Sequence, residues 1–161
     1  METSPLHSAD SDNSVNRDIG IILAVLESGH SVELPATGFS MFPTLRPGDK
    51  VIVRPLTKGE LPKPGSVVVY KENSGFVMHR LVEIIGCDSG YVQFITRGDS
   101  MSEPDKPWPQ QKLLGVANCY KRGNREYPVK TFVPGIWRYK FNRRLLWLYN
   151  WFMWFWNKVK G

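Results

Sequence analysis

The amino-acid sequence predicts a mainly β domain, with a short helix before it and an amphipathic helix after it. Short segments rich in β-branched and aromatic residues recur from Val32 onward, and turn signals separate them. The 161 residues suit one domain, and 42% hydrophobic residues supply a core. The 14 Gly and 12 Pro favour many turns and argue against an all-helical fold.

The predicted strands follow one another closely along the middle of the chain. They lie at Lys50–Arg54, Ser66–Lys71, Phe76–Ile85, Tyr91–Arg97 and Leu113–Lys121. The turn signals lie at Arg46–Asp49, Lys63–Gly65, Asn73–Gly75 and Asp88–Gly90. Short strands at this spacing are typical of a small closed or sandwiched sheet, rather than a parallel sheet with helical crossovers.

The N-terminal region divides into a polar segment and a short apolar one. Residues 1–16 are rich in Ser, Asp and Asn, and we expect them to be disordered. They lack a basic region followed by an apolar stretch, so we do not expect a secretory signal peptide. Within Asp18–Ser28, the apolar run Ile19–Leu26 is too short to span a bilayer. We therefore expect a short helix there that docks on the domain.

The C-terminal segment, residues 132–161, has the composition of an amphipathic helix. The sequence Phe132–Gly135 marks the end of the β domain, and five of the six Trp follow it. Arg143, Asn150 and Asn157 recur every seven residues, so a helix places them on one narrow polar stripe. Leu, Phe and Trp cover the rest of that surface.

Basic residues concentrate in the same part of the chain. Residues 1–120 carry 11 Lys and Arg against 14 Asp and Glu, whereas residues 121–161 carry ten against one. The uncharged stretch Leu145–Asn157 makes about 20 Å of helix, less than the roughly 30 Å hydrocarbon core of a bilayer. Trp rings beside basic residues fit a helix that lies in the membrane interface. Packing on the domain or on a second copy is the alternative.

Cysteine and histidine spacing gives no metal-binding motif. Cys87 and Cys119 cannot form a disulfide framework or a four-thiolate site. His7, His30 and His79 are not clustered as the ligands of a zinc enzyme are. We therefore expect no metal and no cofactor.

Residues able to carry nucleophilic chemistry lie in three places. Ser40 lies in Gly38–Asp49, GFSMFPTLRPGD, and a serine nucleophile needs a base within hydrogen-bond reach. His79, in a predicted strand, is the candidate base. Asp99 and Asp105 follow the next predicted strand, and a carboxylate of this kind is needed to orient the base.

Five short motifs occur in chain order within residues 32–121. They are Ser40–Met41–x–Pro43, Gly48–Asp49 before a strand, Pro64–Gly65–Ser66–Val67–Val68, His79–Arg80, and Gly98–Asp99 with Asp105 six residues on. In these motifs the chain resembles the signal peptidase I family, which shares its fold with self-cleaving repressor peptidases. The His-Arg pair is similar to the archaeal and endoplasmic-reticulum type, in which His stands where most bacterial members have a Lys base.

The resemblance implies roles for four residues. Ser40 attacks the scissile carbonyl, and His79 takes its proton and returns it to the leaving amine. Asp105 is the preferred orienting carboxylate, while Asp99 shares that role or holds its loop. Histidine suits a base at neutral pH because its ordinary pKa lies near about 6.5, whereas a Lys base needs burial to lower its pKa.

Two positions depart from the family pattern. Gly38 stands where many relatives have a Ser whose hydroxyl helps the oxyanion hole. Main-chain N–H groups, including that of Ser40, then have to supply that stabilisation. Ser66 follows Gly65 where relatives usually have Asp, and we expect this to change only a turn.

The sequence thus predicts a membrane-associated serine endopeptidase that cleaves signal or leader peptides. Residues 17–131 form its peptidase domain, with the motif core at 32–121, and residues 132–161 form an aromatic, basic membrane-interface helix. Its expected partners are a peptide or preprotein substrate and a membrane surface, and no nucleic acid. With no export signal and no N-terminal spanning helix expected, we place the catalytic domain on the cytoplasmic side. There it is suited to trimming leaders of small ribosomally made products.

Three other functions stay open. A self-cleaving repressor-type regulator needs a DNA-binding domain, a Lys base and an Ala-Gly cleavage dipeptide. Only about 30 residues precede the β region, and no Ala-Gly dipeptide occurs. A nucleic-acid binder uses the basic tail and stacks bases on its aromatic rings. A catalytically inactive binding module keeps the peptidase fold without hydrolysis.

Overall fold

The computed structural model describes residues 19–72, 75–86 and 91–160. The segment expected to be disordered, residues 1–16, lies outside the described residues. The Asp88–Gly90 turn, Cys87 and His7 also lie outside them.

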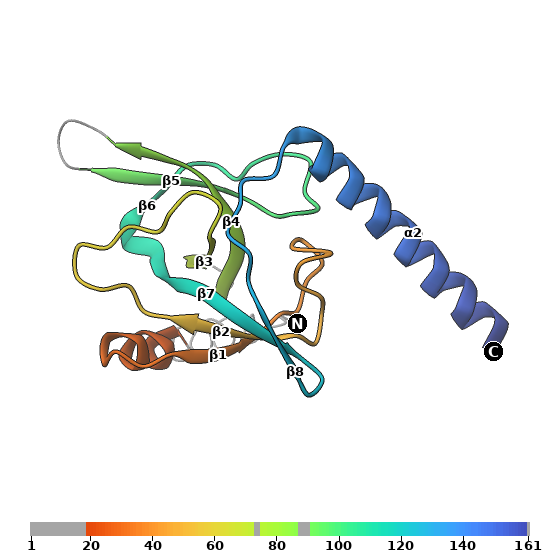
Figure 1. The fold of residues 1–161 in the computed structure, drawn as a ribbon, viewed down its shortest axis with the longest axis horizontal. Coiled ribbons are helices and arrows are strands. Elements are labelled where there is room, and N and C mark those ends of the chain that lie inside the picture. Colours follow the sequence, from red (N-terminus) through yellow and green to blue (C-terminus); the bar gives the residue numbers. More distant parts are fainter. Residues whose placement is uncertain (1–18, 73–74, 87–90, 161) are drawn as a thin grey trace, which may run out of the picture.

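Eight strands form one antiparallel sheet (Figure 1). They are β1 (Val32–Pro35), β2 (Lys50–Arg54), β3 (Val67–Glu72), β4 (Gly75–Gly86), β5 (Val92–Arg97), β6 (Trp108–Pro109), β7 (Leu113–Arg122) and β8 (Arg125–Pro128), with the 3₁₀ turn η1 (Gln110–Lys112) before β7. Hydrogen bonding orders them β1-β2-β7-β3-β4-β5-β6, and β8 pairs with β7. The predicted mainly β fold class is confirmed.

The sheet is open rather than closed into a barrel. In the described ladders β1 pairs with β2 and β6 with β5, and no ladder joins β1 to β6. Of the two arrangements expected, a closed sheet or a sandwiched one, the described ladders exclude only the closed one. The physical reason lies in β6, which has only two residues, of which Pro109 has no N–H to offer another strand.

Alternating side chains of β3 divide the core between the two faces of the sheet. Val67 and Val69 lie in one cluster, together with Met41 and Leu45 from the loop after β1. The intervening Val68 and Tyr70 lie in the other cluster, with Phe94, Trp108 and Leu81. The loop that holds Ser40 is thus anchored in the first cluster, and the ring of Tyr70 in the second.

Residues 19–27 form the expected short helix. Ile19, Ile22 and Leu26 are buried at a spacing that puts them on one helix face, whereas Ile21 is 59% exposed. Burying an aliphatic side chain of this size is worth about 1.5–3 kcal/mol, which fixes this short helix against the sheet.

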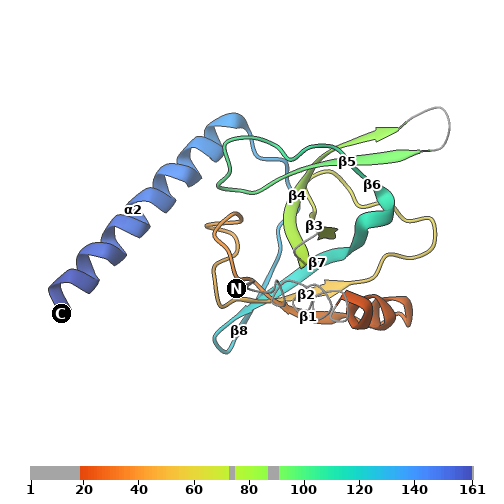
Figure 2. The same cartoon turned by 180° about the vertical axis from the view of Figure 1, so that it is seen from behind.

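The long C-terminal helix α2 (Ile136–Lys160) is also confirmed. Its 25 residues span about 37 Å at the usual rise. Tyr139 and Asn142 in its first turns are each 4% exposed, so this end docks on the domain. Residues 151–159 are all exposed, and this part of the helix projects beyond the sheet in both views (Figures 1 and 2).

Candidate active site

Ser40 lies in the loop between β1 and β2. We call residues 37–46 the Ser40 loop. Met41 and Leu45 point into the core and are 3% and 1% exposed, whereas Ser40 itself is only half-buried. Two apolar anchors on the C-terminal side of the serine therefore hold the loop while the hydroxyl keeps access to solvent.

Gly48 and Asp49 close the base of the Ser40 loop. The N–H of Gly48 donates to the carbonyl of Ala36, and the N–H of Ala36 donates to the carbonyl of Asp49. Gly48 has a φ of 91°, which favours glycine. The Asp49 carboxylate accepts the N–H of Arg46 at 2.8 Å and pairs with Arg122 on β7 at 2.6 Å. The Gly-Asp motif therefore fixes both ends of the loop to the sheet.

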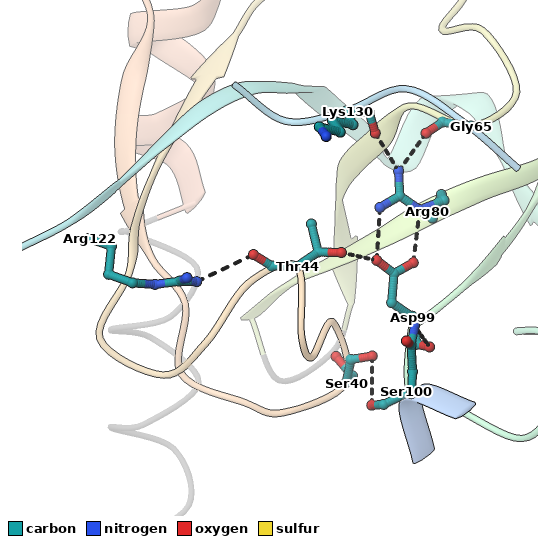
Figure 3. Close-up of polar contacts among 9 residues, drawn as sticks. Ser40, Thr44, Gly65, Arg80, Asp99, Ser100, Arg122 and Lys130 are labelled. Atoms are coloured by element: carbon teal, nitrogen blue, oxygen red, sulfur yellow. Dashed lines mark hydrogen bonds and ion pairs between the residues drawn. The ribbon is translucent and has the colours of Figure 1, made fainter. Parts of the chain in front are cut away.

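A second turn, Gly98–Ser100, holds the main chain of Ser40 (Figure 3). The N–H of Ser100 donates to the Ser40 carbonyl at 2.9 Å, and its hydroxyl donates to the Phe39 carbonyl at 2.7 Å. A Cβ added at Gly98 would lie 2.6 Å from the Ser40 carbonyl oxygen, closer than Cβ atoms approach. Only glycine allows this close approach.

His79, on β4, is hydrogen bonded to Asp105. Its Nδ1 lies 2.6 Å from Asp105 Oδ2, and His79 is 7% exposed. The same carboxylate oxygen accepts the hydroxyls of Thr96 at 2.7 Å and Tyr70 at 3.3 Å. The indole N–H of Trp108 in turn donates to Thr96 at 3.0 Å. Asp105 is thus placed by a chain of hydrogen bonds that does not involve Ser40.

These hydrogen bonds keep Asp105 ionised. Burial by itself raises the pKa of Asp105, but the hydrogen bonds from His79 and Thr96, with the nearby imidazole, outweigh it and hold the pKa below its ordinary value. Burial raises the pKa of Tyr70, so its hydroxyl stays protonated as a donor. At neutral pH the imidazole therefore faces a carboxylate and donates its Nδ1–H to it.

Asp99 has a different partner from Asp105. Its two oxygens each accept a hydrogen bond from Arg80 at 2.8 Å, and one of them also accepts the hydroxyl of Thr44 (Figure 3). Arg80 is 0% exposed and Asp99 is 1% exposed. Arg80 also donates to the carbonyls of Gly65 and Lys130, at 2.7 and 2.8 Å. Asp99 therefore holds the loop after β5, and it makes no hydrogen bond to His79.

Ser40 and His79 line one pocket of about 280 Å³. Most of its other lining residues are apolar: Pro35, Ala36, Met41, Leu45, Phe76, Val77 and Met78. Among the described residues, no hydrogen bond joins the Ser40 hydroxyl to His79. Catalytic hydrogen bonds of this kind are often formed only when substrate is bound.

One edge of β4 is open beside this pocket. Residues 75–80 of β4 pair with β3, whereas β5 pairs with β4 only from Arg80 to Gly86. The main chain of Phe76–His79 therefore has no strand on its second side in the described ladders. A pocket bounded by an unpaired strand edge can accept an extended peptide through main-chain hydrogen bonds.

Gly38 and Ser66, the two positions that depart from the pattern of the resembled family, differ in their surroundings. An added Cβ at Gly38 meets nothing within 4 Å. Ser66 takes part in a turn through its main chain. Its N–H donates to the carbonyl of Lys63, and its carbonyl accepts the N–H of Leu81. Within the described residues, no group of three or more His, Cys, Asp or Glu is placed to hold a metal ion.

Sequence reasoning missed the residues that support the site. Thr96 and Tyr70 lie on predicted strands, but no local motif marks them as partners of Asp105. Asn142, on α2, donates to the Asp99 carbonyl at 2.9 Å, and no motif in the sequence marks it. These contacts depend on the register of distant strands, and the one available signal was the polar character of Thr96 inside an apolar strand.

Comparison of the chain with models of known families gives no match, and comparison with curated proteins gives none.

Proposed function

We propose that this protein is a serine endopeptidase in which Ser40, His79 and Asp105 are nucleophile, base and orienting group. The observation that carries the proposal is the 2.6 Å contact between His79 and an ionised Asp105, made at the wall of the pocket that Ser40 also lines. An imidazole held by a carboxylate on one nitrogen and open to a serine on the other is the arrangement that serine activation requires.

The reaction follows from these positions. Ser40 Oγ attacks the carbonyl carbon of the scissile bond while His79 Nε2 takes the hydroxyl proton. Asp105 stabilises the imidazolium through Nδ1–H, and the imidazolium then protonates the leaving amine as the C–N bond breaks. Water, deprotonated by His79, hydrolyses the acyl-enzyme ester and restores the serine hydroxyl.

The negative charge that develops on the carbonyl oxygen needs donors. Gly38 has no hydroxyl to offer, so we assign this role to main-chain N–H groups of the Ser40 loop. In the described part of the chain, no main-chain carbonyl accepts the N–H of Ser40. That N–H is therefore available to the oxyanion.

The substrate class we propose is an extended peptide, of the signal or leader type that the family resemblance implies. Such a peptide can pair with the open edge at Phe76–His79 and place its side chains in the apolar pocket. The peptide bond to be cut then passes between Ser40 and His79.

We also propose that the enzyme works at a membrane surface, with α2 as the contact. Exposed aromatic side chains cover the second half of α2, among them Trp147, Trp151 and Trp154 at 66%, 52% and 59%. In the described part of the chain, no helix is both long and apolar enough to traverse a bilayer. A helix with exposed Trp and basic neighbours is suited to the interface.

Cleavage of a peptide library in lipid or detergent tests the proposed function. Ser40→Ala and His79→Ala each remove one reacting group and are expected to abolish cleavage. Ser102→Ala and His30→Ala remove the same groups from exposed positions and are the matched controls, expected to cleave as wild type does. Equal cleavage by wild type and Ser40→Ala contradicts the proposal.

One observation favours a second candidate, an inactive binding module of the same fold. Among the hydrogen bonds of the described residues, none joins the Ser40 hydroxyl to His79, so the pocket that both line can hold a peptide without activating the serine. Under this alternative, wild type and both variants bind the same peptides with equal affinity and none releases fragments.

A further inference from the structure

The docked face of α2 contacts the two segments that position Ser40. Near the start of the helix, buried Asn142 donates to the carbonyl of Asp99 at 2.9 Å. Asp99 lies in the Gly98–Ser100 turn, and that turn holds the main-chain carbonyl of Ser40. The helix is therefore hydrogen bonded directly to the turn that fixes the main chain of Ser40.

Two turns further along, Tyr149 contacts the Ser40 loop directly. Its ring lies 6.0 Å from the ring of Phe39 and 5.4 Å from that of Phe42, between centroids. These two residues flank Ser40 and Met41 in the chain, and their rings lie 6.5 Å apart. Tyr149 thus completes a cluster of three rings, two of which belong to residues on either side of Ser40 and Met41 in the chain, so a movement of α2 moves this cluster.

A different face of α2 is exposed to solvent. It presents a stripe of apolar side chains at helical spacing, which we call the outer stripe: Phe141, Leu148, Phe152, Phe155 and Val159. Their exposure runs from 48% for Phe155 to 65% for Val159. A continuous apolar stripe of this length in water is costly and marks an interaction surface.

The positive charge of α2 indicates which kind of partner can cover the outer stripe. The helix carries six basic residues and no acidic one. A second copy of the helix would bring like charges together, whereas an anionic lipid surface attracts them and accepts Trp and Phe rings at headgroup depth. The partner we assign is therefore an anionic membrane surface.

We infer that α2 transmits lipid binding to the active site: the outer stripe lies on anionic lipid, and the docked face, through Tyr149, then fixes the Ser40 loop. Tyr149 is a positioning residue, since it touches Phe39 and Phe42 rather than the reacting atoms. This inference rests on the proposed peptidase function and adds its regulation. Turnover rises on anionic lipid because the serine spends more time in its productive position.

The experiment uses the full chain with vesicles of phosphatidylcholine alone or with added phosphatidylglycerol. Vesicle flotation measures binding, hydrogen exchange of residues 37–46 measures the order of the Ser40 loop, and peptide cleavage gives kcat and KM. The wild type is expected to float with anionic vesicles only, with slower exchange in the loop and a higher kcat.

Two sets of variants separate binding from transmission. The triple change of Leu148, Phe152 and Phe155 to Ser removes most of the outer stripe but keeps the exposed Trp residues, so flotation weakens and kcat falls towards its vesicle-free value. Tyr149→Ala keeps flotation but loses the slower exchange and about tenfold in kcat, with KM little changed, as loss of two ring contacts implies. Tyr149→Phe keeps the ring and restores both. Tyr127→Ala, in the stacked pair on β8 away from the site, is the matched control.

Three results overturn the inference. They are flotation that is as strong without the outer stripe as with it, loop exchange in Tyr149→Ala that slows on anionic vesicles as in wild type, and a dimer in sedimentation that forms through α2 without vesicle binding. Flotation and exchange need no catalysis. If no peptide is cleaved but loop exchange slows on lipid, the proposed peptidase function fails while the coupling through Tyr149 stands.

Discussion

Asp105 and Asp99 can each be replaced by Asn, one at a time. We expect the charge of Asp105 to matter for kcat and the charge of Asp99 to matter for the stability of the fold. Asp105→Asn removes the negative charge beside His79, whose Nδ1 lies 2.6 Å from the carboxylate. Two charges centred roughly 4 Å apart at an effective dielectric constant of about 20 attract by about 4 kcal/mol. Because the imidazolium exists only during the reaction, losing this attraction lowers kcat about 10³-fold.

The same substitution at Asp99 acts on stability. Asp99→Asn leaves the guanidinium of Arg80 buried, 0% exposed, without its counter-charge. Breaking a buried ion pair in this way costs about 3–5 kcal/mol. Asp105 is less buried, and the amide oxygen of Asn at this position still accepts the hydroxyl of Thr96, so Asp105→Asn costs less stability.

Urea unfolding followed by Trp fluorescence measures the free energy of unfolding, and cleavage of one peptide measures kcat. We expect Asp105→Asn to lose kcat with a small change in stability, and Asp99→Asn to lose stability while its folded fraction keeps most of its kcat. An equal loss of kcat in folded Asp99→Asn and in Asp105→Asn, or a wild-type kcat in Asp105→Asn, would contradict these separate roles.

Three further predictions concern stability and the Ser40 main chain. Because the pKa of Asp105 is lowered in the folded state, its stabilising contribution is present above about pH 4 and is lost as the pH falls through its folded pKa. Acid titration of unfolding should therefore be flatter in Asp105→Asn, and an unchanged slope contradicts this. Gly98→Ala should lower both Tm and kcat because of its 2.6 Å approach to the serine carbonyl, whereas Gly38→Ala, in open space, should leave Tm unchanged. Leu26→Ala should cost about 2–5 kcal/mol in urea unfolding, and exposed Ile21→Ala much less; equal losses would mean that the helix at residues 19–27 does not dock.

Strand periodicity and turn residues were enough to predict most of the sheet. The segments predicted at Lys50–Arg54 and Leu113–Lys121 correspond closely to β2 and β7. Short apolar runs that are bounded by Gly and Pro are typical of strands. Three short strands, β1, β6 and β8, were not predicted as elements. Two to four residues give no periodicity to detect, and pairing with a neighbouring strand defines them.

The choice between Asp99 and Asp105 could not be made from sequence. Both residues follow β5 in the chain, and either carboxylate could pair with His79 or with Arg80. The structure places the two carboxylates with adjacent residues of β4, Asp105 with His79 and Asp99 with Arg80, whose side chains point to opposite faces of the strand. Which carboxylate reaches which face depends on the path of the loop, where the N–H of Asp105 returns to the carbonyl of Thr96 at 2.7 Å.

The role of α2 was only partly predictable. Its aromatic and basic composition predicts an interface helix, and the exposed second half of α2 is consistent with that expectation. The contacts of Asn142 and Tyr149 with the site loops were not foreseen. A polar residue on an apolar helix gives no sign of the distant carbonyl it bonds to, so only the packed structure relates this helix to Ser40.

Trapping the acyl-enzyme tests the proposed Ser40 mechanism most directly. Wild-type protein is mixed with a cleavable peptide on anionic vesicles, quenched in acid within the first turnover, digested and examined by mass spectrometry. We expect the N-terminal fragment esterified to Ser40, and no adduct in Ser40→Ala or His79→Ala. An adduct on another residue, or cleavage by Ser40→Ala at the wild-type rate, would contradict that mechanism.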